Sequence, residues 1–409
     1  MKKVSATLLL TCCLSTVLFA QKKNEAYHYA IRHADSSITI DGALEEATWK
    51  TAAVATDFYM VLPMDTSFAD LRTEVRMAYD ERFVYISAVN FQSHPVRIES
   101  LRRDWNFGKN DNFIFFMDPF DDQTNGFTFG ANAAGAEWDG QQYEGGTADL
   151  SWENRWYSAV KRYPDRWIFE AAIPFKTLRY KKDITRWGIN FSRNDLTTTE
   201  KSSWAPVPRQ MPTASLAYTG VLDWDAPPPK AGPNVSLIPY ALGGGTKGFR
   251  PDEPFDGRAD IGLDAKVAVT SSLNLDATVN PDFSQVEVDR QVTNLDRFEL
   301  FFPERRQFFL ENSDLFNNLG LSNLRPFFSR RIGLNAPIRG GARLSGRLDK
   351  NWRIGVMDIQ TGETDESGAP PQNFGVLTFQ RRVLSRSNIT GFFINKQSFD
   401  SEQYPDQPA

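Results

Sequence analysis

Residues 260–279 alternate between apolar and polar side chains, and this period of two restricts the segment to β-structure. A turn at residues 270–272 divides the segment into two arms. The apolar positions are Ile261, Leu263, Ala265, Val267 and Val269, and then Leu273, Leu275, Ala277 and Val279. Arms of about 9–11 residues with a tight turn between them are typical of a transmembrane β-hairpin with a lipid face and a lumen face. The amphipathic sheet of a soluble sandwich has the same alternation, but the strand length and the short turns favour the membrane hairpin.

Two further hairpins follow in the same half of the chain. One runs from Ala342 through a turn at residues 349–351 to Val356, and the other spans residues 373–395. Between the first two hairpins, residues 298–312 are dense in aromatic and charged side chains and show no clear period. This stretch is interpreted either as a lumenal plug or as a loop packed against a barrel wall. The pattern predicts a partial outer-membrane β-barrel segment over residues 234–409.

The first half of the chain has a different pattern. Nine of the ten tryptophans lie between residues 38 and 225. Short runs of aromatic and β-branched residues alternate there with turn sequences such as residues 118–126 and 163–166. We therefore predict a β-sandwich over residues 38–225, and an all-β chain overall. The proline-rich residues 226–233 predict a stiff linker between the two halves.

The N-terminus has the layout of an export signal. Lys2 and Lys3 precede apolar runs that end at Ala20, which is typical of a secretory signal peptide over residues 1–20. Cys12 and Cys13 both fall inside it, so the exported chain would hold no disulfide, thiolate metal site or cysteine nucleophile. The cysteine pair also allows a lipoprotein anchor, which the lack of a small residue before either cysteine disfavours.

The charge and hydropathy pattern narrows the possible partners. The formal net charge is −5, and no cluster of Lys and Arg stands out, so nucleic acid is not an expected partner. No apolar run of about 18 residues follows the signal, so no transmembrane helix is expected. Any membrane role would therefore fall to β-strands.

Several segments of the first half resemble family 9 carbohydrate-binding modules. They are residues 40–49, which open with Ile-Asp-Gly, and residues 80–88, 110–118 and 172–175. The resemblance covers residues 38–225 and implies a sugar-binding β-sandwich.

The second half looks like an uncharacterised family of outer-membrane β-barrel proteins, on residues 280–287 and 302–312. In that family such a module commonly precedes the barrel. Its members are longer than this chain, which has too few strands to close a barrel. A fragment or a truncated copy is therefore expected.

The resemblance also implies a sugar site. Family 9 modules clamp a terminal sugar between two tryptophans, and the positions here that are similar are Trp105 and Trp204. Both follow polar loop residues, as an exposed stacking platform requires. The expected hydroxyl partners are Asp111, Asn190, Arg193 and Asn194. The alternative is that Trp105 and Trp204 are core residues, since tryptophan is usually well buried. Four further tryptophans sit in strand or turn patterns and are expected in the core: Trp49, Trp156, Trp167 and Trp187.

Calcium is the expected cofactor. Family 9 modules are similar in having carboxylates near the Asp41-Gly42 turn, and calcium prefers oxygen ligands. The candidate ligands are Asp41, Glu45 and Glu46. A second acidic loop contains Asp118, Asp121, Asp122 and Asn125, a composition that a hairpin turn explains equally well.

Catalysis has no motif to support it. A glycosidase needs two carboxyl groups on either side of a sugar, and the available acidic residues have no distinctive pattern. They are Asp139, Glu144, Glu153 and Glu170. His28, His33 and His94 lie in loops without triad-like neighbours.

The sequence therefore predicts a non-catalytic, carbohydrate-binding sandwich in the periplasm, attached to an outer-membrane barrel segment. The expected partners are an oligosaccharide or terminal sugar, outer-membrane lipid, and glycoside hydrolases or uptake machinery of carbohydrate catabolism. The alternative is a structural or transport barrel whose sandwich is a gate or a partner-docking module. Trp105 and Trp204 would face solvent in the first case and be buried in the second. A glycoside hydrolase is the third hypothesis.

Overall fold

The structure is a computed structural model. It describes residues 22–399 apart from residues 151, 153, 182–183, 230–234, 248–255, 271, 282, 284–292, 294–301, 303, 318, 322–324, 335, 350, 364–369 and 384–386. The predicted signal peptide, Glu153 and residues 230–233 of the predicted linker lie outside the described residues.

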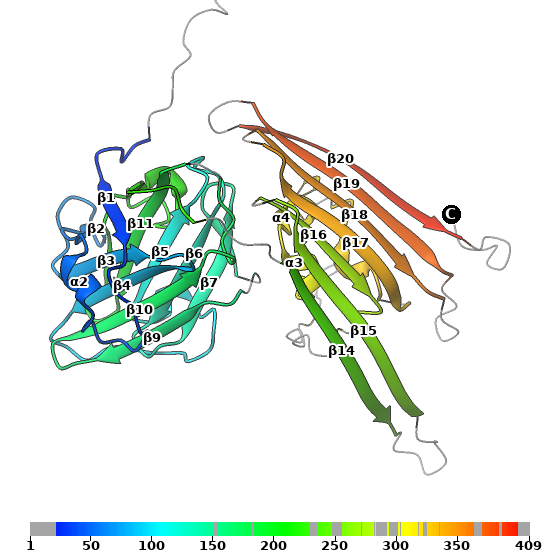
Figure 1. Ribbon diagram of the computed structural model, residues 1–409, viewed down its shortest axis with the longest axis horizontal. Helices are drawn as coiled ribbons and strands as arrows, with labels where there is room; N and C mark the ends of the chain where they lie inside the picture. The colour runs from blue at the N-terminus through cyan, green and yellow to red at the C-terminus, as the bar shows by residue number, and fades with distance from the viewer. Residues whose placement is uncertain are drawn as a thin grey trace, which may run out of the picture.

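The N-terminal domain is a sheet of thirteen strands that curls into a sandwich, seen on the left of Figure 1. Its strands are β1 (His28–His33), β2 (Tyr59–Leu62), β3 (Thr73–Tyr79), β4 (Phe83–Phe91), β5 (Asn112–Asp118), β6 (Gly126–Asn132), β7 (Glu137–Tyr143), β8 (Thr147–Asp149), β9 (Tyr157–Arg162), β10 (Arg166–Pro174), β11 (Arg186–Asp195), β12 (Glu200–Ser203) and β13 (Gly220–Trp224). Helical structure in this domain is limited to α2 (Ala47–Thr51), η1 (Phe107–Lys109) and η2 (Leu216–Tyr218).

Strand β1 joins the two layers of the sandwich. Its residues 28–31 pair in parallel with β13, and Arg32 and His33 then pair in parallel with β3. One layer has the order β8-β7-β6-β5-β11-β13-β1, and the other has the order β1-β3-β4-β10-β9. Strand β12 pairs with β11 and with β2, which extends the first layer at one end.

The core between the layers is strongly aromatic. Because side chains alternate along a strand, Phe113 and Phe115 of β5 point into the core while Ile114 and Phe116 point to the other face of the layer. The predicted core tryptophans are confirmed, since all of them are buried: Trp49, Trp156, Trp167 and Trp187. The sequence placed the start of the sandwich at residue 38, which is wrong because β1 begins ten residues earlier.

The C-terminal domain is an antiparallel sheet of seven strands, each paired with the next strand along the chain. The strands are β14 (Val235–Thr246), β15 (Asp256–Ala268), β16 (Leu273–Val279), β17 (Ile338–Arg347), β18 (Trp352–Thr361), β19 (Gln372–Arg382) and β20 (Asn388–Ser398). The three predicted hairpins are confirmed as β15–β16, β17–β18 and β19–β20. The predicted all-β class is therefore confirmed, with a sandwich followed by barrel-like antiparallel strands.

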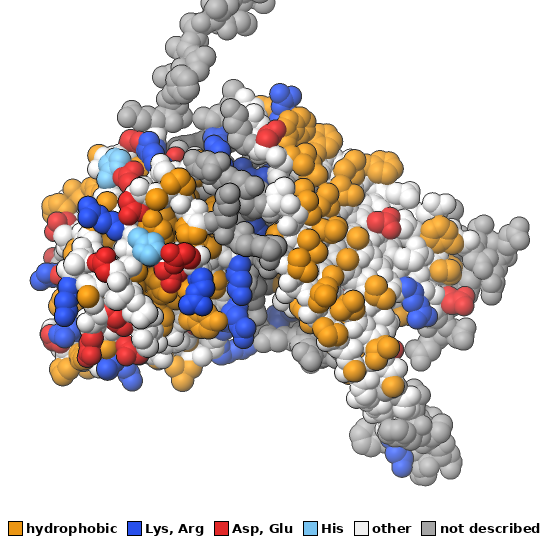
Figure 2. All heavy atoms as spheres, viewed as in Figure 1, with side chains coloured by type: hydrophobic (Ala, Val, Ile, Leu, Met, Phe, Trp, Pro, Cys, Tyr) orange, Lys and Arg blue, Asp and Glu red, His pale blue; other side chains and the backbone are white. Residues whose placement is uncertain are grey.

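The polarity of this second sheet is inverted relative to that of the sandwich. On β16 the polar Asn274, Asp276 and Thr278 are buried, while Leu275 and Val279 between them are exposed. We call the face with the buried polar side chains the inner face. The opposite, outer face gathers apolar side chains, seen on the right of Figure 2, and includes Ile261, Leu263, Leu275, Val279, Val356, Leu377 and Phe379.

The inner face is covered by short helices, α3 (Gln307–Leu310), α4 (Asp314–Asn317) and η3 (Ser329–Arg331). The rings of Phe308 and Phe316 lie 5.6 and 5.7 Å from the guanidinium of Arg343 on β17. The same aromatic cluster includes Met357 and Ile359 of β18. Residues 304–317 thus pack against the sheet, which places part of the charged aromatic stretch on its inner face.

Helix α2 is a short helix of five residues, and residues 175–177 form a turn after β10. Within the described part of the chain, no helix is both long and apolar enough to cross a membrane.

Candidate functional site

Trp105 belongs to a small buried cluster on the face of β5 that points away from the core between the two layers. Its side chain is only 3% exposed and packs with Ile114, Phe116 and Trp138. Its indole Nε1 donates to the carbonyl oxygen of Ala136 at 3.0 Å. The loop after β4 folds back over the outward-facing side chains of β5, so an aromatic residue in that loop becomes buried. The prediction that Trp105 is an exposed platform is wrong.

Trp204 follows β12 and is also largely buried, at 6% exposure. Its ring packs against Phe191 of β11 and against the edges of Tyr27 and Tyr29. Phe191 belongs to the core cluster that lies between the two layers, whereas Trp105 belongs to the cluster on the opposite face of β5. The two tryptophans therefore lie on opposite faces of one layer and do not form a clamp. Their burial is the outcome expected for a gate or docking module.

A different aromatic site lies beside Trp204. A cavity of about 330 Å³ is lined by side chains from four segments of the domain, and it is called the aromatic cavity here. Its aromatic residues are Tyr27, Tyr29, Tyr59, Phe68 and Trp204, and its polar side chains include His28, Thr56 and Asp57. The volume is at the lower end of the range of about 300–1,000 Å³ that is usual for small-molecule sites.

Strand pairing brings the walls of this cavity together. Ser203, just before Trp204, pairs with Tyr59 of β2, and Tyr59 is bridged to Phe68. The rings of Tyr59 and Phe68 lie 4.5 Å apart. Gly220 allows this close packing, because a Cβ there would lie 2.8 Å from the Trp204 ring and 2.7 Å from the carbonyl oxygen of Tyr27.

The polar groups of the aromatic cavity are suited to hydroxyl ligands. Burial and, next, the side chain of Tyr59 raise the pKa of Tyr27, so its phenol stays a neutral donor and acceptor. Nδ1 of His28 lies 2.6 Å from a carboxylate oxygen of Asp223, which orients the imidazole ring. Asp57 has a φ of 56°, in the left-handed region that few residues other than glycine adopt. Such strained residues occur preferentially at functional sites.

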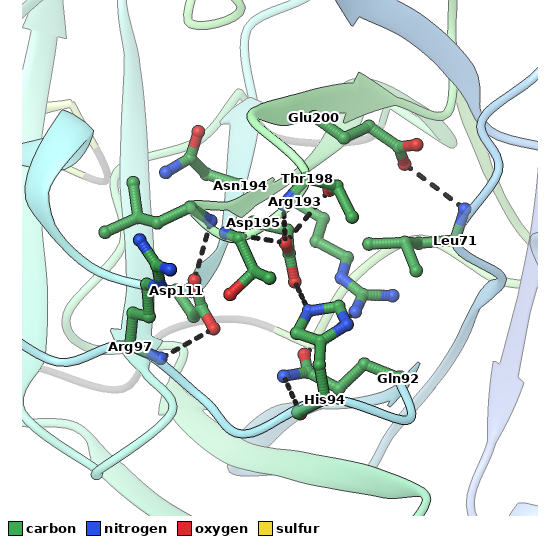
Figure 3. A network of polar contacts seen from close by, with 12 residues as sticks. Leu71, Gln92, His94, Arg97, Asp111, Arg193, Asn194, Asp195, Thr198 and Glu200 are labelled. Atoms are coloured by element: carbon green, nitrogen blue, oxygen red, sulfur yellow. Dashed lines mark hydrogen bonds and ion pairs between the residues drawn. The ribbon is translucent and has the colours of Figure 1, made fainter.

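The predicted hydroxyl partners hold the backbone instead of facing this cavity. The carboxylate of Asp111 accepts from the backbone N–H groups of Arg97 at 2.9 Å and Leu196 at 2.8 Å (Figure 3). Asn194 donates to the carbonyl oxygen of Asn110 at 3.2 Å. Both side chains are buried, and burial raises the pKa of Asp111. They tie the end of β11 to the loop before β5, which is a structural role.

Arg193 and Glu200 bind backbone groups close in sequence to the cavity residue Phe68. Arg193 is fully buried and donates to the carbonyl oxygens of Arg72 at 3.0 Å and Phe91 at 2.9 Å. The carboxylate of Glu200 accepts from the backbone N–H of Asp70 at 3.0 Å and from that of Leu71 at 3.3 Å, the second of which is drawn in Figure 3. Burial lowers the pKa of Arg193 to about 10, although the nearby Asp195 opposes the shift. This network fixes the segment that follows Phe68.

Asn190 positions Trp204. Its side-chain oxygen accepts from the backbone N–H of Ala205 at 2.9 Å, and its Nδ2 donates to the carbonyl oxygen of the same residue at 3.0 Å. A buried amide that pairs with both backbone groups of the next residue holds the tryptophan in one orientation. Among the predicted polar residues, Asn190 is therefore the one most directly connected to the aromatic cavity.

Two family models match parts of this chain. Residues 40–209 match the family described as carbohydrate family 9 binding domain-like, and residues 233–343 match a domain of unknown function, DUF5916. The resemblance is confirmed for the N-terminal half. The match of the second half carries no functional description, so its outer-membrane location stays a prediction. No curated protein matches the chain.

Solved structures similar to the N-terminal domain include two complexes of a family 9 carbohydrate-binding module from Caldicellulosiruptor kristjanssonii. The complex with cellotriose is 15% identical, has a TM-score of 0.37 and covers 49% of this chain and 94% of that module. The glucose complex is 17% identical, with a TM-score of 0.35 and coverages of 48% and 96%. A candidate carbohydrate-binding protein from Bacteroides uniformis ATCC 8492 is 14% identical, with a TM-score of 0.40 and coverages of 48% and 99%.

The predicted calcium ligands near the Asp41-Gly42 turn bond to the backbone or face solvent. Asp41 accepts from the backbone N–H of Ala43 at 2.8 Å, Glu46 accepts from that of Thr39 at 3.1 Å, and Glu45 is exposed. Within the described ranges, no group of three or more His, Cys, Asp or Glu residues is placed to hold a metal ion. Calcium at the Asp41 turn stays a prediction.

The buried carboxylate of Glu170 holds the Asp41-Gly42 turn. Its carboxylate accepts from the backbone N–H groups of Asp41 and Gly42, both at 3.0 Å, and from the indole Nε1 of Trp49 at 2.9 Å. Burial raises its pKa to about 7 although these donors oppose the shift. The Asp-Gly and Trp positions of residues 40–49 thus serve to dock the N-terminal turn onto β10.

The second acidic loop is a hairpin turn, as its composition allowed. Asp118 accepts from the backbone N–H of Gln123 at 2.6 Å, and Asp122 accepts from those of Thr124 at 2.8 Å and Asn125 at 3.1 Å. Burial and the nearby Asp122 raise the pKa of Asp118 to about 7. Among the acidic residues considered for catalysis, Asp139 is buried against Arg103, while Glu170 is held by the Asp41 turn.

Sequence reasoning missed Tyr27, Tyr59 and Phe68. The criterion used for tryptophan, an aromatic residue that follows polar loop residues, also fits Phe68 after Thr66 and Ser67. Tyr27 lies before residue 38, the predicted start of the sandwich, and is therefore absent from the predicted sugar site.

Proposed function

We propose that the sandwich binds the end of a glycan in the aromatic cavity and performs no catalysis. The observation that carries this proposal is the family 9 match over residues 40–209, which includes most of the cavity wall. Sugar rings present flat C–H faces that pack on aromatic rings, while phenols, carboxylates and imidazoles bind hydroxyl groups. Tyr59 and Phe68 would supply the stacking surface, and Tyr27, His28 and Asp57 the polar contacts. The small volume favours a terminal sugar over an internal stretch of glycan.

The same proposal places the second sheet in the outer membrane. Its apolar outer face and polar inner face have the polarity of a barrel wall between lipid and lumen. The sandwich would then lie in the periplasm and hold sugars that have crossed the membrane, in support of carbohydrate catabolism or uptake. Glycoside hydrolases or uptake proteins would act on the retained sugar.

Two experiments test these parts separately. Calorimetric titration of the full chain in detergent with a panel of mono- and oligosaccharides should detect binding with one site per chain. No heat of binding across neutral hexoses, pentoses and their oligomers would contradict the sugar proposal. Protease treatment of intact cells should leave the sandwich undigested, and its rapid removal would contradict the periplasmic location.

A further inference from the structure

Four consecutive side chains, Glu311 to Asp314, lie between the sandwich and the inner face of the second sheet. They run from the end of α3 into the first residue of α4, the helices between the two domains in Figure 1. The first three are buried although all four are polar. Buried polar groups are stable only when they are paired, so their partners show what this segment does.

Glu311 has partners in both domains. One carboxylate oxygen accepts from Nδ2 of Asn274 on β16 at 2.7 Å, and the other pairs with Lys266 of β15. Arg179 of the sandwich lies 3.7 Å from the first oxygen. Burial would raise the pKa of Glu311, but Lys266 and then Arg179 lower it to about 2. The carboxylate therefore stays ionised and is shared between sheet and sandwich.

Asn312 also contacts both domains. Its side-chain amide donates to Oγ of Ser345 on β17 at 3.1 Å, and its Oδ1 accepts from Nε2 of Gln141 on β7 at 3.3 Å. Its backbone N–H points back to Oε1 of the same glutamine at 3.4 Å. A reciprocal amide pair of this kind fixes the position of one chain segment against another.

Of the two remaining residues, Ser313 contacts the sandwich and Asp314 contacts the second sheet. Ser313 donates from its hydroxyl to a carboxylate oxygen of Asp149, on the edge strand β8 of the sandwich, at 2.7 Å. Asp314 accepts two hydrogen bonds from the guanidinium of Arg353 on β18, at 2.7 and 3.0 Å. Such a bidentate pair is among the stronger and more directional polar contacts in proteins.

A direct contact between the domains adds to this set. Arg347 of β17 forms an ion pair with Asp122 in the loop after β5, and its guanidinium lies 4.5 Å from the ring of Phe120. Both charged side chains are largely buried. Unpaired, each would face a large desolvation cost, so the two domains stabilise each other when they are docked.

We propose that Glu311–Asp314 is a docking connector that holds the sandwich as a cap over the inner face of the second sheet. The sheet side of the connector consists of Lys266, Asn274, Ser345 and Arg353. The sandwich side consists of Gln141, Asp149 and Arg179. When the sandwich separates from the second sheet, buried charges on both sides lose their partners. The docked and the released sandwich are therefore two distinct states. This inference does not depend on sugar binding.

Disulfide trapping tests the proposal on the full chain. The two cysteines of the chain, Cys12 and Cys13, are replaced by serine, so the introduced cysteines report a single pair. The Asp149→Cys/Ser313→Cys variant should form an intramolecular disulfide under mild oxidation. The matched control is Asp165→Cys/Ser313→Cys, with its first cysteine in the exposed turn between β9 and β10. Equal trapping in both variants would overturn the proposal.

Hydrogen exchange gives a second measurement that requires no cysteine variant. In the wild-type chain the amides of residues 141–149 should be protected, and Glu311→Gln should raise their exchange rate by at least about tenfold. Amides of β10, inside the sandwich, should keep their protection and so report that the domain remains folded. Unchanged exchange in residues 141–149 would overturn the proposal.

Discussion

The sandwich and the second sheet use the same alternation of side chains with opposite polarity. In β5 of the sandwich, both faces are apolar and both are covered, by the aromatic core on one side and by Trp105 and its neighbours on the other. In β16 of the second sheet, the polar face is buried and the apolar face is exposed. The comparison shows that period-two alternation fixes strand structure, whereas the environment of each face depends on what packs against it.

The largest expected difference concerns core packing. Phe115 is fully buried in the sandwich, so Phe115→Ala should lower the free energy of unfolding of that domain by about 3–5 kcal/mol. Leu377 on the outer face is 43% exposed, so Leu377→Ala should change the stability in detergent by less than about 1 kcal/mol. Urea unfolding followed by tryptophan fluorescence measures both. Similar losses would show that the outer face is covered by protein.

An arginine introduced on each domain distinguishes a side chain that faces lipid from one that faces solvent. In lipid vesicles, Leu377→Arg should destabilise the second sheet by about 2–4 kcal/mol, because the arginine would face hydrocarbon. Leu101→Arg is the matched control, since Leu101 is 74% exposed on the sandwich and should tolerate the change. Reversible unfolding from vesicles gives both values. A neutral effect of Leu377→Arg would contradict the lipid-facing assignment.

The sandwich alone should show a characteristic pH dependence. Burial raises the pKa values of Asp118, Asp139 and Glu170 to about 7, from ordinary values near 4. These carboxyl groups bind their protons more tightly in the folded state, so their contribution is full below pH 4 and is lost as the pH rises to 7. Stability should therefore fall by several kcal/mol between pH 5 and pH 8.

Glu170→Gln is the control for this pH dependence, because the amide removes one titrating group. The variant should lose less stability than the wild type over the same pH range, whatever its absolute stability. Unfolding midpoints at several pH values measure the slope. A wild-type stability that is constant or rises from pH 5 to pH 8 would contradict the assignment.

Much of the fold could be predicted from the sequence because strand signals are local. The hairpins at β15–β16 and β17–β18 followed from alternation and turns, and the core tryptophans followed from their strand context. The site could not be predicted in the same way. Trp105 lies in a polar loop, and only the long-range packing of that loop over Ile114 and Phe116 buries it. Arg193 and Asp111 have the residue types of sugar ligands, but the backbone groups that occupy them come from distant segments.

The contacts of the docking connector could not be predicted from the sequence either. The sequence marked residues 298–312 as charged and aromatic but left a plug and a loop equally open. The assignment of Glu311 and Asn312 depends on partners in two separate sheets, Arg179 and Gln141 among them. No local pattern encodes such a contact, because its partners are more than 100 residues away in the chain.

Calorimetric titration of cavity variants, with whichever sugar binds the wild-type chain, tests whether the aromatic cavity is the sugar site. Tyr59→Ala and Phe68→Ala should each weaken binding by about tenfold or more, because each removes one stacking ring. Trp105→Phe and Tyr157→Ala, which change a buried core residue and an exposed tyrosine outside the cavity, should leave the affinity unchanged. Binding that survives both cavity variants but is lost in Trp105→Phe would contradict the assignment of the site.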